Sequence, residues 1–296
     1  MVLRRVVVIV AVAVLMACTS REEPRRADSA AAAPSIVSLR ATEGTISAPD
    51  SIRAGWTTFR LANHGGEVHY GHIVRLDDGR TPQDLVGAYA EAIRTSAPRP
   101  AWVKRFGGPG GTAPGDSSSV TQQLEPGSYV WICPVEDSTG TPHFTKGEVK
   151  PFVVYGVDAN AVASAAAPPS DAAIRLVDFS FTVDSSLRAG QHTIRVENGG
   201  AEPHDLNVMK LAPGITIENI RAWLNPERAR RDDTKAPPPI ESMGSPIGGV
   251  AAMSPGMSAY LQMNLTPGEY AVFCMVTAPD GRSHIEHGMI QQLKVE

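Results

Sequence analysis

Cysteine, histidine and methionine residues near the end of the 296-residue sequence could bind a metal ion together. Nine residues separate Cys274 from His284; Met289 follows shortly after, and His204 lies far upstream. A thiolate and two imidazoles supply three donors that suit both Cu(I) and Cu(II), and a thioether is a weak fourth donor. These residue types could therefore hold a copper ion in the second half of the chain.

The first half of the chain carries the same donors with one change. His69, Cys133 and His143 stand in the same order, and Glu148 occupies the position of Met289. A carboxylate is a harder donor than a thioether, and it favours Cu(II) or admits Zn²⁺. The sequence therefore predicts a second, weaker site that holds copper, zinc or no metal. In the last case the site is vestigial and Glu148 points into solvent.

Three further histidines lie near these donors. His287 is an alternative ligand to His284, but only His284 has a counterpart in the first half. His64 and His72 lie close to the upstream histidine of the first half. We expect both to occupy exposed loop or strand positions and to bind no metal.

The two sets of donors lie in two copies of one sequence pattern. A shift of 135 positions places residues 51–55 on 186–190, and the match resumes after a six-residue insertion in the second copy. We predict domains at 34–155 and 171–296, joined by an Ala- and Pro-rich linker at 156–170. Separate domains need not bring equivalent cysteines together, so we expect two free thiols rather than a disulfide.

Strand patterns dominate each copy. In the second copy, apolar alternation predicts strands within residues 174–183, 193–196, 205–211, 260–265, 270–276 and 289–295. Thr81 and Thr216 can each cap a helix, and the Pro- and Gly-rich segment 227–249 is expected to be a surface excursion. The sequence thus predicts an all-β fold of two tandem Greek-key β-sandwiches, each with a helical insertion.

The order of the donors resembles that of the cupredoxins, the blue type 1 copper proteins, whose β-sandwich carries an electron-transfer copper. This resemblance implies trigonal and axial copper ligands in the second copy at His204, Cys274, His284 and Met289. It implies a weaker set in the first copy at His69, Cys133, His143 and Glu148. Family members usually place two to four residues between the cysteine and the second histidine, whereas this sequence has nine. The longer loop leaves open a less rigid site or a site without metal.

The first residues predict export and a lipid anchor. Arg4 and Arg5 precede the apolar run 6–16, which is too short to cross a bilayer. The run ends at Leu15-Met16-Ala17-Cys18, which resembles the lipobox of bacterial lipoproteins and implies a signal peptide at 1–18 with lipid on Cys18. We expect a disordered tether at 19–33 and a protein of the cell envelope that faces the periplasm or exterior. An ordinary signal peptide with a chance cysteine is the alternative.

Composition excludes several functions. A net charge of −4 without a basic stripe argues against nucleic acid as a partner. Copper enzymes that share the cupredoxin sandwich typically hold a copper cluster between domains with His-X-His pairs. The eight histidines of this sequence form no such pair, so the resemblance implies no cluster between domains and no enzymatic activity. The leading hypothesis is a membrane-tethered copper protein that exchanges electrons with a redox partner protein. The alternatives are a metal-free binding or scaffold module and a copper-dependent oxidoreductase.

Overall fold

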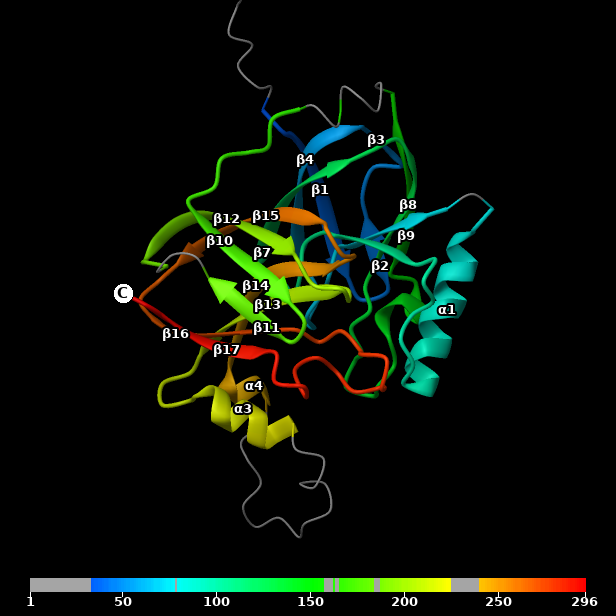
Figure 1. The fold of residues 1–296 in the computed structure, drawn as a ribbon. Helices are drawn as coiled ribbons and strands as arrows, with labels where there is room; N and C mark the ends of the chain where they lie inside the picture. The colour runs from blue at the N-terminus through cyan, green and yellow to red at the C-terminus, as the bar shows by residue number, and fades with distance from the viewer. Residues whose placement is uncertain (1–32, 78, 157–161, 163–164, 184–186, 225–239) are drawn as a thin grey trace, which may run out of the picture. The chain divides into compact units, whose positions relative to one another are not determined.

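The computed structural model describes residues 33–77, 79–156, 162, 165–183, 187–224 and 240–296 (Figure 1). The predicted signal peptide, Cys18 and most of the tether lie outside these residues. No helix within the described ranges is long and apolar enough to span a membrane. Two β-sheets make up most of the described chain, which confirms the prediction of an all-β fold.

The first sheet contains eight described strands, in the order β11 (Ser180–Val183), β10 (Ala172–Val177), β12 (Gly190–Asn198), β15 (Ser258–Leu265), β7 (Ser117–Leu124), β4 (Gly55–Asn63), β1 (Ser35–Thr42) and β2 (Thr45–Ser47). The second sheet contains nine, in the order β17 (Ile290–Val295), β16 (Gly268–Phe273), β13 (His204–Leu211), β14 (Gly244–Met253), β6 (Lys104–Gly107), β5 (His72–Leu76), β8 (Gly127–Ile132), β9 (Val149–Tyr155) and β3 (Ser51–Arg53). All strands predicted in the second copy are present within a few residues, while β14 was not predicted.

The two sheets pack face to face around apolar side chains. In the first copy, Phe59 of the first sheet shares a core cluster with Trp131 and Phe152 of the second sheet. The rings of Trp131 and Phe152 stack with their centroids 3.6 Å apart. In the second copy, Ile194 and Val208 come from opposite sheets and share another buried cluster. Burial of both inner faces therefore holds each copy as a sandwich.

Both sheets run through both sequence copies. β15 of the second copy pairs with β7 of the first, with Tyr260 opposite Thr121. β14 pairs with β6 at Met253 and Phe106. Residues Ala33–Glu296 accordingly form one compact unit. In this arrangement each copy covers a strand edge that the other would leave unpaired. Their boundaries remain a sequence-based prediction.

Two glycine-rich segments meet where the copies join. The amide of Gly110 donates to the carbonyl of Gly249 (3.0 Å), and the amide of Ala251 donates to the carbonyl of Gly108 (2.9 Å). A Cβ atom on Gly110 would lie 2.8 Å from the carbonyl carbon of Gly249. The prediction of a surface excursion at 227–249 is therefore wrong for its last residues, because their small side chains permit close backbone contact inside a sheet.

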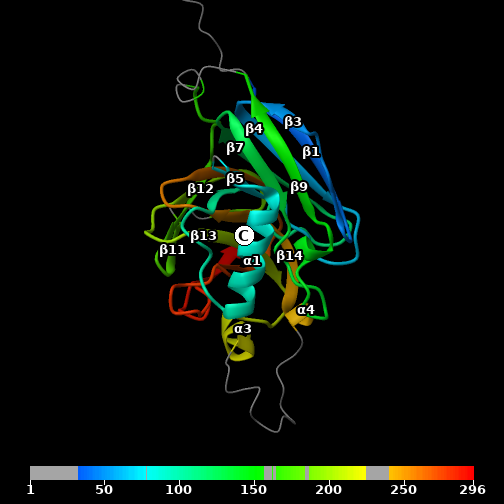
Figure 2. The same ribbon diagram turned by 90° about the vertical axis from the view of Figure 1, so that its right-hand side faces the viewer.

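Helices connect strands within both copies. Thr81 and Asp84 form a capping box at the start of α1 (Pro82–Thr95). This helix lies over the second sheet (Figure 2). Its Leu85 and Tyr89 pack against side chains on the outer face of that sheet. The second copy has α3 (Ile217–Leu224) and the short α4 (Ile240–Met243) at the corresponding place, and the 3-10 helix η1 (His143–Lys146) follows β8 in the first copy. The predicted helical insertions are confirmed.

Candidate metal centres

The second sheet and the loop after β16 position the four predicted ligands of the second copy, which we call the second centre. His204 begins β13, Cys274 directly follows β16, and His284 and Met289 lie in the loop that leads to β17. That loop folds back on itself: Thr277 bridges Ser283 as an antiparallel pair. The amide of His284 then donates to the carbonyl of residue 276 (2.8 Å). The nine-residue loop therefore brings His284 back beside Cys274.

Three donor atoms converge at the second centre. Nδ1 of His204 and Nδ1 of His284 lie 2.9 Å apart. Sγ of Cys274 lies 3.4 Å from Nδ1 of His284 and 3.8 Å from Nδ1 of His204. Bonds of about 2.0–2.3 Å to one metal ion place such donors roughly 3.3–3.8 Å apart. The three side chains therefore fit a single ion, with the imidazoles slightly closer together than a bound ion would hold them.

Two carboxylates orient the imidazoles from outside. Nε2 of His204 lies 2.8 Å from Oδ1 of Asp178, and Nε2 of His284 lies 3.0 Å from Oε2 of Glu202. When Nε2 carries the proton and donates it to the carboxylate, the lone pair of Nδ1 faces the thiol. Burial lowers the pKa of both imidazoles, and the adjacent His204 further lowers that of His284. Neutral imidazole is the form that binds a metal ion.

The thiol of Cys274 is buried and free of any disulfide. Burial raises its pKa, and the nearby carboxylate of Asp205 raises it further. The backbone amide of Asp205 donates to the sulfur at 3.4 Å. A bound cation favours the thiolate, so this buried sulfur is suited to a metal but unreactive without one.

The structure places Met289 in the apolar core and distinguishes His284 from His287, the two alternative ligands. Met289 is fully buried in the same apolar cluster as Cys274, and its amide donates to the carbonyl of His284 (2.9 Å). Its role as axial ligand remains a prediction. Nε2 of His287 instead lies 3.0 Å from Asp280, and His287 is not among the converging donors.

The first copy gathers its four predicted donors in a first centre. Nδ1 of His69 lies 2.8 Å from Oε2 of Glu148, and Nδ1 of His143 lies 3.5 Å from the same oxygen. Sγ of Cys133 is 3.5 Å from Nδ1 of His143. From outside, Glu67 contacts Nε2 of His143 at 2.8 Å, as Glu202 does in the second centre.

Glu148 is fully buried, which contradicts the alternative that it points into solvent. A buried carboxylate is costly unless it is paired or bound to a metal. Here one oxygen faces the two imidazoles, and the other accepts a hydrogen bond from Gly44 (3.0 Å). Nε2 of His69 is buried and has no hydrogen-bond partner among the residues that the structure describes. The first centre therefore contains all four predicted donors, but the imidazole of His69 is held less firmly because its Nε2 has no such partner.

Sequence reasoning missed the outer carboxylates. Glu67 and Glu202 aligned in the two copies, but no role was assigned to them. Asp178 stands 135 positions after Glu43, so the two acidic residues are equivalent in the two copies. That equivalence could have identified Asp178 as a candidate outer carboxylate. His72 was expected to be exposed but is buried, because β5 is covered on both faces.

The chain is similar to several solved structures at low sequence identity. No family model and no curated protein sequence matches the chain. Reduced auracyanin from the photosynthetic bacterium Roseiflexus castenholzii is a similar solved structure, with 17% identity, a TM-score of 0.27, and coverage of 42% of this chain and 94% of that one. A multicopper oxidase, at 13% identity and a TM-score of 0.24, covers 88% of both chains.

A further similar structure is the Cu-containing nitrite reductase from Thermus scotoductus SA-01, at 12% identity and a TM-score of 0.21, with coverage of 88% of this chain and 61% of that one. At these scores the donor atoms, and not the similarity, support metal binding. The expectation that the protein is not an enzyme is contradicted, since the similar solved structures include an oxidase and a reductase.

Proposed function

We propose that this protein is a cupredoxin-like copper protein that transfers electrons at its second centre. The observation that carries this proposal is the convergence of two imidazole Nδ1 atoms and one thiol sulfur within 3.8 Å, all buried. Two nitrogens and one sulfur form a donor set that tolerates both oxidation states of copper. A copper ion held there would supply a one-electron redox couple.

The protein's own residues prepare this centre. His204, Cys274 and His284 would hold the ion, with Met289 as the weak fourth donor. Asp178 and Glu202, described above, hold the imidazoles with Nδ1 inward, and the sheets exclude water. Fixed donors lower the reorganisation that accompanies a change of oxidation state, which favours electron transfer.

The visible spectrum of the purified protein with added Cu(II) tests this proposal. We expect an intense thiolate-to-copper absorption band that Cys274→Ala abolishes, because the thiolate of Cys274 supplies the transition. Cys133→Ala is the matched control, since it removes the equivalent thiol of the other copy, and it should retain that band. No copper uptake, or uptake without a Cys274-dependent band, would contradict electron transfer and favour a metal-free binding module.

We assign the first centre to Cu(II) or Zn²⁺. The buried carboxylate of Glu148 is a hard donor and contributes a negative charge beside the two imidazoles. Metal analysis of the Cys274→Ala protein should therefore find up to one ion, and Cys133→Ala in addition should remove it. Retention of the ion in the double variant would contradict this assignment.

We further propose that the protein is tethered to a bacterial membrane through lipid on Cys18 and meets a redox partner protein in the cell envelope. The support is the charged and apolar sequence that precedes Cys18. Cys18→Ala should release the protein from the membrane fraction or block its maturation. Unchanged fractionation together with an unchanged mass of the mature protein would overturn the lipid anchor.

A further inference from the structure

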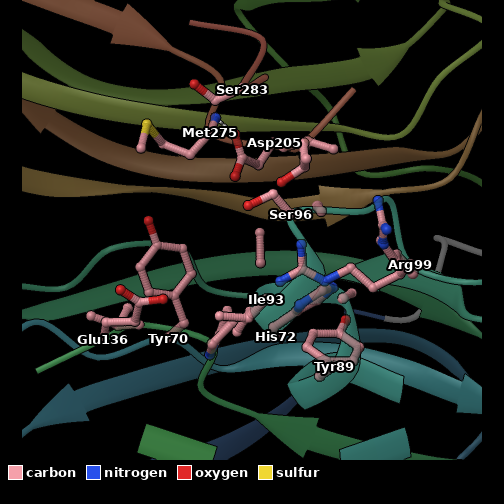
Figure 3. A pocket seen from close by; sticks show the side chains of 18 of the residues that line it. Tyr70, His72, Tyr89, Ile93, Ser96, Arg99, Glu136, Asp205, Met275 and Ser283 are labelled. Carbon is pink, nitrogen blue, oxygen red and sulfur yellow. Dashed lines mark hydrogen bonds between the residues drawn. The ribbon is translucent and has the colours of Figure 1, made fainter. Parts of the chain in front are cut away.

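A cavity of about 520 Å³ lies between the two sequence copies (Figure 3). His72 and Tyr89 line it from the first copy, while Asp205 and Met275 line it from the second. Asp205 connects the cavity to the second centre, because it lines the cavity and its amide donates a hydrogen bond to the sulfur of Cys274, a predicted metal ligand. Neither predicted centre uses the groups described next.

Arg105, on β6, is the charged group that makes this cavity unusual. It is only 6% exposed, and within the described residues no carboxylate forms an ion pair with its guanidinium. Burial lowers its pKa, although Asp205 and Tyr89 oppose that effect. Oδ1 of Asp205 already accepts hydrogen bonds from Asn207 (3.0 Å) and Met275 (2.8 Å). A buried cation without a paired anion is costly, and an anionic ligand would remove that cost.

Two buried polar atoms line the cavity together with Arg105, and within the described residues neither makes a hydrogen bond of good geometry. They are Nε2 of His72 and the hydroxyl oxygen of Tyr89, in side chains that are 3% and 1% exposed. The two rings lie 6.3 Å apart, and Arg99 stacks over the ring of Tyr89 at 4.8 Å. Buried polar groups normally find a partner in the protein, in water or in a ligand. The phenol can donate to an anion that Arg105 attracts.

The other residues that line the cavity determine which anions it favours. Glu136, Glu286 and Asp205 also border the cavity and disfavour a ligand with two negative charges. Ile93 and Met275 provide apolar contact surface, and the volume falls in the range of small-molecule sites rather than of a single ion. A singly charged organic molecule matches these walls best.

We propose that this cavity binds a small organic monocarboxylate, with the carboxylate facing Arg105 and the hydroxyl of Tyr89. The site needs no metal. An experiment that disproves carboxylate binding therefore leaves the copper proposal standing, and the loss of the copper proposal leaves this site standing. A ligand here would lie beside the residue that contacts the sulfur of Cys274, which places a small-molecule site next to a candidate redox centre.

Calorimetry and thermal melting of the purified, EDTA-treated full chain test the site, with benzoate as probe and benzamide as its uncharged match. We expect saturable binding of benzoate and a rise in Tm, with benzamide at least about tenfold weaker, because charge-assisted hydrogen bonds provide the difference. Arg105→Met should weaken benzoate binding about tenfold or more, and Tyr89→Phe should weaken it severalfold. The exposed Arg53→Met is the control and should bind as the wild type does.

The unliganded Arg105→Met protein should melt no lower than the wild type, because the variant removes an unpaired buried charge. If Arg105→Met does not fold, the unpaired-cation argument fails, and so does the proposal. Equal binding of benzoate and benzamide, unchanged binding by Arg105→Met, or tighter binding of inorganic phosphate than of benzoate would each overturn the monocarboxylate site.

Discussion

The hydroxyl of Tyr70 donates a hydrogen bond to Oδ1 of Asn207, across the boundary between the two sequence copies. The amide of Tyr70 also donates to the sulfur of Cys133 at 3.4 Å. Asn207 in turn donates to Asp205 at 3.0 Å, and the amide of Asp205 donates to the sulfur of Cys274 at 3.4 Å. A continuous series of covalent and hydrogen bonds therefore links the thiol of Cys133 to the thiol of Cys274.

Tyr70→Phe removes this contact while keeping the aromatic ring. We expect the free energy of unfolding to fall by about 1–2 kcal/mol, because the oxygen of Asn207 loses its donor in a buried position. Denaturant unfolding of the whole chain measures the change. The exposed Tyr155→Phe is the control and should change stability little. Equal effects of the two substitutions would show that the contact between the copies contributes nothing.

The glycine contact between the copies should not tolerate a side chain. Gly110→Ala places a methyl group 2.8 Å from the backbone of Gly249, and we expect a loss of about 1–3 kcal/mol in stability. Gly87→Ala is the matched control, because Gly87 lies in α1 with open space around its Cα and alanine favours helices. Thermal melting should show the two alanines shifting Tm in opposite directions. A stabilising Gly110→Ala would contradict the close backbone packing.

The outer carboxylates should control metal affinity at the second centre. Glu202→Gln removes the charge that orients His284, and we expect about 10–100-fold weaker copper binding with the visible band retained. Asp280→Asn is the control, because Asp280 contacts His287, which lies outside the converging donors. Competition titration with a copper chelator compares the affinities. Equal affinity for both variants would remove the orienting role of Glu202.

The methionine should tune the reduction potential of a copper ion at the second centre. Met289→Leu preserves the buried apolar volume but removes the thioether, a weak donor, and this change disfavours Cu(II). We expect the Cys274-dependent band to remain and the potential to rise in a redox titration. His287→Ala should leave both band and potential nearly unchanged. A lower potential in Met289→Leu would show that the thioether is not an axial ligand.

Acid should destabilise the protein through His72. Burial, together with the nearby charges of Arg105 and Arg99, lowers the pKa of His72 to about 3. Its unfolded pKa is about 6.5, so below that pH the unfolded state binds more protons and stability falls until about pH 3. The loss approaches about 1.4 kcal/mol per pH unit from this one group. His72→Phe should reduce the pH dependence of Tm between pH 6 and 4, and an unchanged dependence would contradict a neutral buried His72.

The sequence alone determined which donors recur and in what order. The resemblance of their order to that of the cupredoxins, together with the repeat, identified His204, Cys274 and His284, because a repeat and a ligand order are properties of the linear chain. Strands such as β12 and β16 were found from short-range alternation, since side chains on a strand alternate between its faces. The helix after Thr81 followed from a capping signal that involves only neighbouring residues.

The tertiary structure alone decided how the two copies meet. β14 has a glycine-rich sequence typical of a loop, and it becomes an inner strand because Gly249 and Gly110 allow two backbones to approach. The burial of His72 and of the unpaired Arg105 likewise follows from α1 and the second copy closing over the sheet. Such contacts join residues more than a hundred positions apart, and their stability depends on packing that no local pattern records.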